Sequence, residues 1–188
     1  MRICCAPRGG LDGRTAAYAL LWGVFSRDYP GNLPKIEKTP NGKPFFPERP
    51  DIHFSISHAQ THVLCALSDC PIGADIESPR HVSRRALGFF ASPEELAIFE
   101  PLDLWVLKES YLKLLGGTLP LVRKKKFGRE GGEIVLEGSA HGNGGPAHDC
   151  RSLMFRLYMI DGCHAAVASL GATPPGSIEL LLGLEAIC

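Results

Sequence analysis

Two carboxylates in the stretch IGADIE, residues 72–77, have a spacing that suits metal binding. If the stretch is a β-strand, Asp75 and Glu77 share one face, and the three apolar side chains lie on the other. The two Cα atoms would be roughly 6.6 Å apart, which lets both carboxylates reach one hard cation and makes them repel without it. Taken alone, the stretch is explained equally well as an acidic strand edge that resists aggregation.

A second candidate group lies on a predicted helix from about Leu102 to Leu115, which ends at two glycines. Trp105, Glu109 and Lys113 recur at i, i+4 and i+8 and therefore share one stripe. A lone Glu–Lys pair is most often a surface ion pair worth about 0.2–0.5 kcal/mol, but a tryptophan on the same stripe argues for another role. Glu109 would add a third oxygen ligand to the pair on the strand, a set that suits Mg²⁺ bound with water and a substrate phosphate. The neighbouring stripe is expected to face the core and contains Leu104, Leu107, Tyr111 and Leu114 or Leu115.

A third group could donate hydrogen bonds to phosphate. Ser57 and His58 end a predicted strand in the stretch SISH, Lys43 stands in NGKP, and Arg14 lies on the first predicted helix. Hydroxyl, imidazole and cationic side chains are effective phosphate donors. Each of these residues alone is weak evidence, since a histidine at a strand end is more often a solvated turn residue.

The elements that must position these groups follow from periodicity and end signals. One helix runs from an Asp12 cap to Pro30 and Gly31, and another begins at a capping box formed by Ser92 and Glu95. Short apolar or alternating runs predict strands at 52–57, 62–67, 72–77, 133–138, 153–160 and 163–170, with a loop at 138–149. One helix is thus followed by three strands, and helix followed by strand hairpin occurs twice.

Composition excludes several classes of protein. The chain has 188 residues, long enough to bury roughly 70% of its unfolded surface without metal or disulfide staples. Its 20 basic and 20 acidic residues cancel, so no global field attracts nucleic acid or an anionic membrane. No apolar run has the length of a membrane span, and MRICCAPRGG lacks the apolar region of a signal peptide. We therefore expect a cytoplasmic protein whose seven cysteines are reduced, with Cys65 and Cys163 in the core.

In this order, NGKP, FSISHAQTHVLCAL, IGADIE and LWVLKESYLKLLGG resemble the motifs of the 4'-phosphopantetheinyl transferases. The type is the larger, two-halved one, similar to the surfactin synthetase-activating transferase, and the resemblance covers the chain from about Gly13 to Leu119. It implies an α+β fold of two similar halves related by a pseudo-twofold, 1–82 and 83–188, each a helix packed on a small antiparallel sheet. The resemblance and the paired halves further imply an active site in the cleft between the halves and a monomer.

The resemblance implies a holo-[acyl-carrier-protein] synthase type of activity. The phosphopantetheine of coenzyme A would be transferred to a serine of an apo acyl or peptidyl carrier protein, with 3',5'-ADP released. Carriers of fatty acid, polyketide and nonribosomal peptide synthesis all fit. Asp75, Glu77 and Glu109 resemble the ligands of Mg²⁺, for which Mn²⁺ could substitute. Glu109 also resembles the base and Lys113 the group that stabilises the leaving phosphate, while Arg14, Lys43, Ser57 and His58 match positions that contact coenzyme A.

Some features depart from the family, and other functions stay open. The short segment before the first helix leaves no counterpart for basic residues that contact the 3'-phosphate. The run RKKK, 123–126, is interpreted either as a contact for the acidic face of a carrier helix or as a solvated charge run. The alternatives to transfer are a Mg²⁺-dependent nucleotide diphosphate hydrolase and a degenerate module that binds coenzyme A or a carrier. Nothing in the sequence resembles a nucleic-acid-binding motif.

Overall fold

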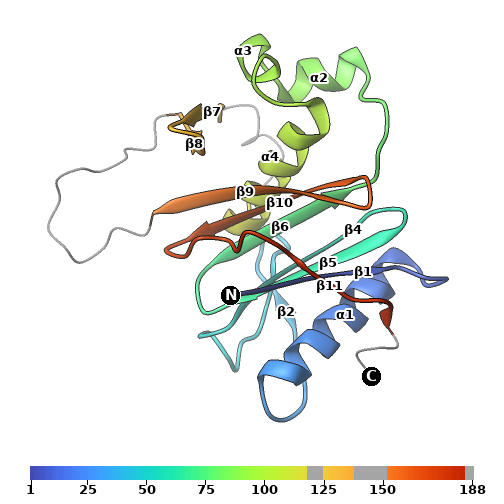
Figure 1. Cartoon of the computed structure of the whole chain (residues 1–188). Helices are drawn as coiled ribbons and strands as arrows, with labels where there is room; N and C mark the ends of the chain where they lie inside the picture. Colours follow the sequence, from blue (N-terminus) through green and yellow to red (C-terminus); the bar gives the residue numbers. More distant parts are fainter. Residues whose placement is uncertain (118–124, 138–151, 185–188) are drawn as a thin grey trace, which may run out of the picture.

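The computed structural model describes residues 1–117, 125–137 and 152–184, and it is a mixed α+β fold as predicted (Figure 1). The helices are α1 (Gly13–Asp28), α2 (Arg84–Phe90), α3 (Pro93–Leu96) and α4 (Pro101–Leu115). The strands of the first half are β1 (Arg2–Pro7), β2 (Glu37–Lys38), β3 (Pro44–Phe45), β4 (His53–His58), β5 (His62–Ser68) and β6 (Ile72–Glu77). The later strands are β7 (Phe127–Glu130), β8 (Glu133–Leu136), β9 (Leu153–Ile160), β10 (Cys163–Leu170) and β11 (Glu179–Leu180).

Two sheets form the centre of the molecule, and their strand order differs from the order along the chain. The first sheet has the order β11-β1-β5-β4, and the second has the order β6-β10-β9. The strand β6 therefore leaves the sheet of its sequence neighbours β4 and β5 and pairs antiparallel with β10, where Asp75 lies opposite Ala166. The predicted run of one helix and three strands is thus divided between two sheets. The pseudo-twofold relation and the boundary at residue 82 stay predictions.

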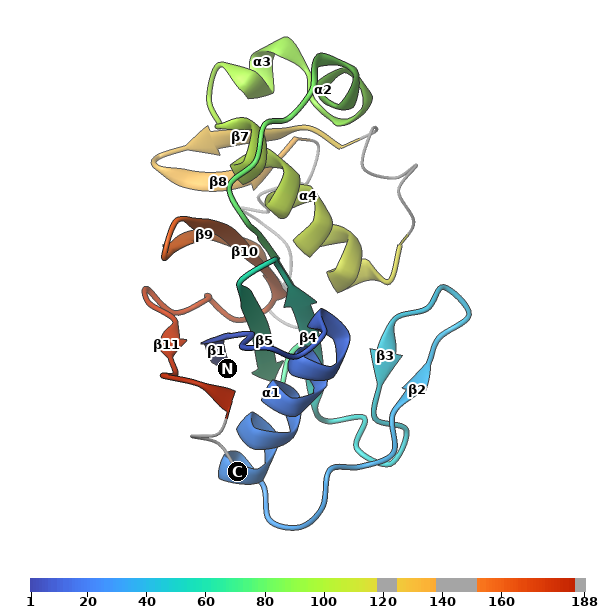
Figure 2. The same ribbon diagram turned by 90° about the vertical axis from the view of Figure 1, so that its right-hand side faces the viewer.

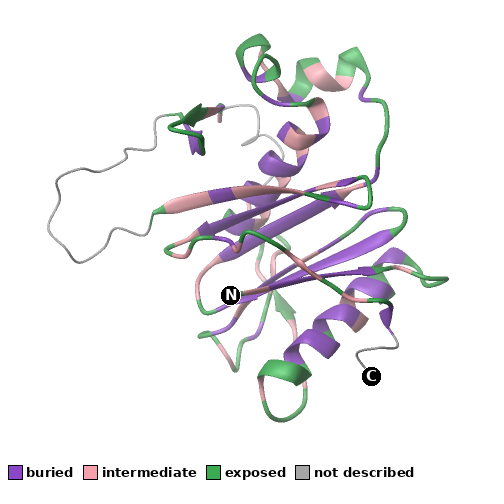
Figure 3. Ribbon diagram, viewed as in Figure 1, coloured by how far each residue is buried: buried purple, intermediate pink, exposed green. Residues whose placement is uncertain are grey.

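Helices and sheets stack in four layers, with α1 and α4 on the outside (Figures 1 and 2). One apolar cluster lies between α1 and the first sheet, a second lies between the two sheets, and a third lies between α4 and the second sheet. The strands β1, β5, β6 and β10 are accordingly buried along most of their length, as Figure 3 shows. This arrangement leaves the edge strands β4 and β6 of the two sheets close to each other.

The ends of the long helices follow the predicted signals. Asp12 accepts hydrogen bonds from the backbone N–H groups of Arg14 and Thr15 at the start of α1. Ser92 and Glu95 form the predicted capping box at the start of α3. At the end of α4, Gly116 adopts a left-handed conformation with φ of 64°, which a glycine accepts without steric cost.

Other expectations are met in part. Cys65 and Cys163 are buried as predicted, and Cys4, Cys5, Cys65 and Cys163 are free thiols. The strands β1 and β11 were not predicted, although β1 pairs with β5 over its whole length. None of the helices in the described ranges is long and apolar enough to cross a membrane. The predicted loop at 138–149 lies outside the described residues.

Candidate active site between β6 and α4

The acidic face of β6 lies under α4. Ile72, Ala74 and Ile76 face the cluster between the sheets, so the alternation predicted for IGADIE is confirmed and its acidic face is turned toward α4. At Gly73 the two backbones meet: a Cβ built there would lie 2.0 Å from the carbonyl oxygen of Ser110 and 2.3 Å from the backbone nitrogen of Leu114. Only glycine permits this contact, which brings the stripe of α4 to the carboxylates of β6.

Asp75 is the most enclosed of the candidate ligands, with 5% of its surface exposed. Its Oδ1 accepts a hydrogen bond of 2.7 Å from the Ser57 hydroxyl and forms an ion pair of 2.7 Å with Lys113 Nζ. Its Oδ2 is buried and has no hydrogen-bond partner. Ser57 and Lys113, both predicted site residues, therefore contact the predicted ligand Asp75. Both contacts use the same oxygen of the carboxylate, Oδ1.

Glu77 lies two residues after Asp75 in β6, at the rim of the site. Its Oε1 accepts a hydrogen bond of 3.1 Å from Trp105 Nε1, and its Oε2 lies 3.3 Å from Arg80 Nε. The tryptophan that opens the stripe of α4 therefore orients a carboxylate of β6, which explains why an aromatic residue shares that stripe. This contact was not predicted from the sequence.

Glu109 completes the acidic group from the side of α4. Burial raises the pKa of its carboxyl above the ordinary value, and the charges of Asp75 and Glu77 raise it further, while Lys113 opposes the shift. These are the effects expected when three carboxylates share a partly desolvated site that holds a single lysine. The three carboxylates are therefore electrostatically coupled.

The donor atoms of this site are of the type that a hard cation prefers. All three candidate ligands supply carboxylate oxygens, the type that Mg²⁺ prefers, and Asp75 offers a buried oxygen without a protein partner. In the described ranges, no three His, Cys, Asp or Glu side chains stand close enough together to hold a metal ion as they are. The donor chemistry therefore fits the cation, while the present positions of the described side chains do not form a metal site.

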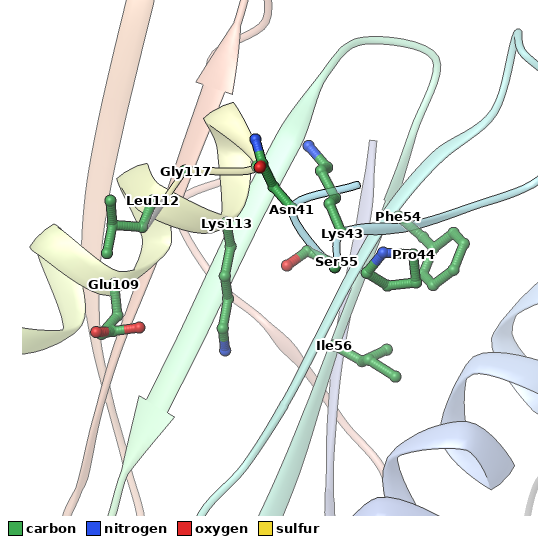
Figure 4. Close-up of a pocket in the computed structure, with 12 residues that line it drawn as sticks. Asn41, Lys43, Pro44, Phe54, Ser55, Ile56, Glu109, Leu112, Lys113 and Gly117 are labelled. Atoms are coloured by element: carbon green, nitrogen blue, oxygen red, sulfur yellow. The ribbon is translucent and has the colours of Figure 1, made fainter. Parts of the chain in front are cut away.

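A cleft of about 280 Å³ lies beside the acidic group, between α4 and the segment that carries β3 and β4 (Figure 4). Glu109 and Lys113 project from successive turns of α4, and Lys43 and Ser55 stand on the other side. Lys43 Nζ donates a hydrogen bond of 2.6 Å to the carbonyl of Leu114 at the end of α4, and burial lowers its pKa to about 8. The lysine thus closes one end of the cleft, and its contact with coenzyme A stays a prediction.

The remaining predicted contacts lie at the start of α1. The imidazole of His58 packs against Gly13, where an added Cβ would lie 2.6 Å from the ring. Arg14 is exposed, and its guanidinium stands 5.9 Å from the centre of the Tyr18 ring. His58 and Arg14 therefore lie at the start of α1. His58 directly follows Ser57, which contacts Asp75.

The structure also shows a buried ion pair that the sequence did not reveal. Lys108 Nζ lies 2.8 Å from Glu95 Oε1, with 2% and 3% of the two side chains exposed. Lys108 also donates to the carbonyl of Lys125, and Glu95 accepts from the backbone N–H of Phe127, so the pair ties α3 and the β7 segment to α4. No local signal in the sequence marks Lys108 as buried, and only the fold encloses it.

The described part of the basic run 123–126 offers limited support for a carrier contact. Lys126 Nζ lies 3.4 Å from Glu94, and both side chains are exposed. Arg123 and Lys124 lie outside the described residues. The interpretation of this run as a carrier contact stays a prediction.

Comparison with known proteins finds relatives that are named as transferases. No family model matches the chain. The 4'-phosphopantetheinyl transferase Sfp of Bacillus subtilis (strain 168) is 35% identical over 114 residues, which are 54% of this chain and 51% of the relative. The 4'-phosphopantetheinyl transferase gsp of Aneurinibacillus migulanus is 37% identical over 91 residues, 43% of this chain and 38% of the relative.

A longer match extends the similarity. The 4'-phosphopantetheinyl transferase ffp of Bacillus subtilis is 32% identical over 136 residues, 65% of this chain and 61% of the relative. The chain spans about half the length of the first curated relatives that it matches, between 38% and 51% in the first three. Several relatives with this name agree, and the motifs meet in one site, so the chain is similar to the 4'-phosphopantetheinyl transferases over the matched residues.

Proposed function

We propose that this chain transfers the 4'-phosphopantetheine group of coenzyme A to a serine of an apo acyl or peptidyl carrier protein and acts as a monomer. The observation that carries the proposal is the meeting of Asp75 and Lys113 across β6 and α4, beside Glu109 and an open cleft. Relatives named as 4'-phosphopantetheinyl transferases support it. In the reaction, the serine oxygen forms a bond to the phosphorus that carries pantetheine, the pyrophosphate P–O bond breaks, and 3',5'-ADP leaves.

The proposed reaction needs a cation, and Asp75, Glu77 and Glu109 are the residues that would hold Mg²⁺ or Mn²⁺. The bound cation would supply positive charge that offsets the charge of the pyrophosphate. The buried Oδ2 of Asp75 and the all-oxygen donor set support this assignment.

The side chains of α4 supply the proton transfer and the second positive charge. Glu109 takes the proton of the carrier serine, either directly or through a water. Lys113 donates a hydrogen bond to Asp75 and stabilises the charge that develops on the leaving phosphate. Coenzyme A is bound by a set of polar residues, which either contact it or hold the residues that contact it. These residues are Arg14, Lys43, Ser57 and His58.

A groove of about 540 Å³ between α2 and α4 offers a place for the carrier beside this site. Its lining combines a basic residue, Arg85, with the aromatic residues Phe89, Phe90 and Trp105. Trp105 links the groove to Glu77 through its indole N–H. An acidic amphipathic helix would bind such a mixed surface and bring its end close to the carboxylates.

The experiment is intact mass spectrometry of a panel of apo carriers incubated with the chain, coenzyme A and Mg²⁺. We expect a mass increase of one phosphopantetheine group, which Asp75→Ala and Glu109→Ala abolish. Glu133→Ala removes an exposed carboxylate at the start of β8 and serves as the matched control that keeps the activity.

The other functions give different products in the same assay. A nucleotide diphosphate hydrolase would release 3',5'-ADP from coenzyme A without any carrier. A binding module would retain coenzyme A and change neither the coenzyme nor the carrier. Either result with the whole panel of carriers would refute transfer to these carriers.

A further inference from the structure

The Ser57 hydroxyl is committed to a carboxylate. Ser57 is 8% exposed and Asp75 is 5% exposed, and the hydroxyl lies 2.7 Å from Oδ1. An ionised carboxylate is only an acceptor, so the hydroxyl donates its single proton to Asp75. Lys113 Nζ donates to the same oxygen, also at 2.7 Å. Both protein donors therefore converge on Oδ1.

The other oxygen of Asp75 is left without a protein partner. Oδ2 is buried and accepts no hydrogen bond from any residue that the structure describes. A buried acceptor without a partner is costly, and in native proteins it commonly marks a place where water or an ion binds. The unequal use of the two oxygens thus separates a held oxygen from an available one.

The neighbouring serine fixes the backbone beside the same aspartate. β4 pairs with β5 and β6 pairs with β10, and no backbone ladder joins β4 to β6 among the described strands. Ser55 Oγ spans this seam, since it accepts from the Ala74 N–H at 2.9 Å and donates to the Ala74 carbonyl at 3.4 Å. Ser55 therefore holds the backbone before Asp75, and Ser57 holds the carboxylate itself.

We propose that Ser57 is a positioning residue, whose hydroxyl holds Oδ1 of Asp75 together with Lys113 and thereby keeps Oδ2 available to a divalent cation. The inference rests on the proposed function, because the cation belongs to that reaction. It assigns Ser57 to the carboxylate, whereas the family resemblance implies a contact with coenzyme A. Residues that orient a metal ligand commonly change metal affinity by 10- to 100-fold when they are removed.

The test measures binding of Mn²⁺ alone, by the loss of the free-ion electron paramagnetic resonance signal, with and without coenzyme A. We expect Ser57→Ala to weaken Mn²⁺ binding about 10-fold or more. Ser57→Thr keeps the hydroxyl and should restore the affinity. Ser68→Ala is the matched control, since it removes a buried hydroxyl of β5 that bonds Asp69 and the Cys70 N–H rather than the carboxylate of Asp75, and its effect on Mn²⁺ should be much smaller. Thermal melts show whether each variant is folded, and the threonine variant decides the question if the alanine variant does not fold.

Three results would overturn the inference. Ser57→Ala could bind Mn²⁺ as tightly as the wild type, it could weaken coenzyme A binding in metal-free buffer instead, or the wild type could bind no Mn²⁺ in either condition. The carrier assay separates this inference from the proposed function. Ser57-dependent Mn²⁺ binding without transfer would refute only the function, and transfer with unchanged Mn²⁺ affinity in Ser57→Ala would refute only the positioning role.

Discussion

Replacement of Gly73 by alanine tests the contact that brings α4 to β6. The Cβ of the new residue would stand 2.0 Å from the carbonyl oxygen of Ser110 and 2.3 Å from the nitrogen of Leu114. Both atoms belong to the helix backbone, so no side-chain rotation relieves the overlap. The helix must move away from the strand, or the strand must bend.

The size of the effect follows from these distances. An ordinary contact of a Cβ begins at 3.4 Å, so the distance to Ser110 must grow by 1.4 Å. Overpacking of a core costs about 1–3 kcal/mol, and a backbone partner places this case at about 3 kcal/mol. For a chain of this size that lowers the Tm by about 6–12 °C. Glu109 and Lys113 move with the helix, and a misplacement of about 1 Å can reduce a reaction rate about 10²-fold.

Thermal denaturation and the carrier assay measure the two effects. For thermal denaturation, Gly88→Ala in α2 is the matched control, because no atom of the described residues lies within 4 Å of its added Cβ. An alanine there should stabilise the chain by up to about 1 kcal/mol, since glycine disfavours a helix interior. A Gly73→Ala variant with a Tm within about 2 °C of the wild type, a shift that corresponds to less than about 1 kcal/mol, would refute the close packing of α4 on β6.

Three further predictions concern charged groups. In metal-free buffer, Glu109→Gln should raise the free energy of unfolding at neutral pH, because the folded state raises the pKa of this carboxyl, and urea titrations should show the gain disappearing below its ordinary value of 4.5, where both states are protonated. Burial lowers the pKa of Lys43 from 10.5 to about 8, so between these values the unfolded chain binds more protons; the stability of the wild type relative to Lys43→Met should therefore rise with pH across this window, and parallel curves for the two proteins would contradict the shift. Lys108→Met leaves the charge of Glu95 buried without its partner, and chemical denaturation should show a loss of about 3–5 kcal/mol in the free energy of unfolding.

Local sequence signals predicted the elements that carry the site. Apolar periodicity and end signals gave α1 and α4, and the alternation of IGADIE gave the acidic face of β6. The stripe of Trp105, Glu109 and Lys113 follows from helix geometry alone and needs no knowledge of the neighbours. These predictions succeeded because they depend on residues within one or two turns.

Pairings between distant segments were not predictable in this way. The short connection between β5 and β6 favours a place for β6 beside its neighbour, yet β6 pairs with β10, about ninety residues later. The strand β1 is apolar only from Ile3 to Pro7, which is too short to be distinguished from a core segment by periodicity, and its pairing with β5 defines it.

The sequence by itself therefore determined which side chains are candidates for the chemistry and which faces of their elements present them, because side-chain direction follows from the local backbone period. The tertiary structure alone decided what each of these side chains touches. It turned Ser57 toward Asp75, gave Oδ1 two donors and left Oδ2 without a partner. Such contacts depend on the relative placement of β4, β6 and α4, which is set by packing between layers rather than by any one segment.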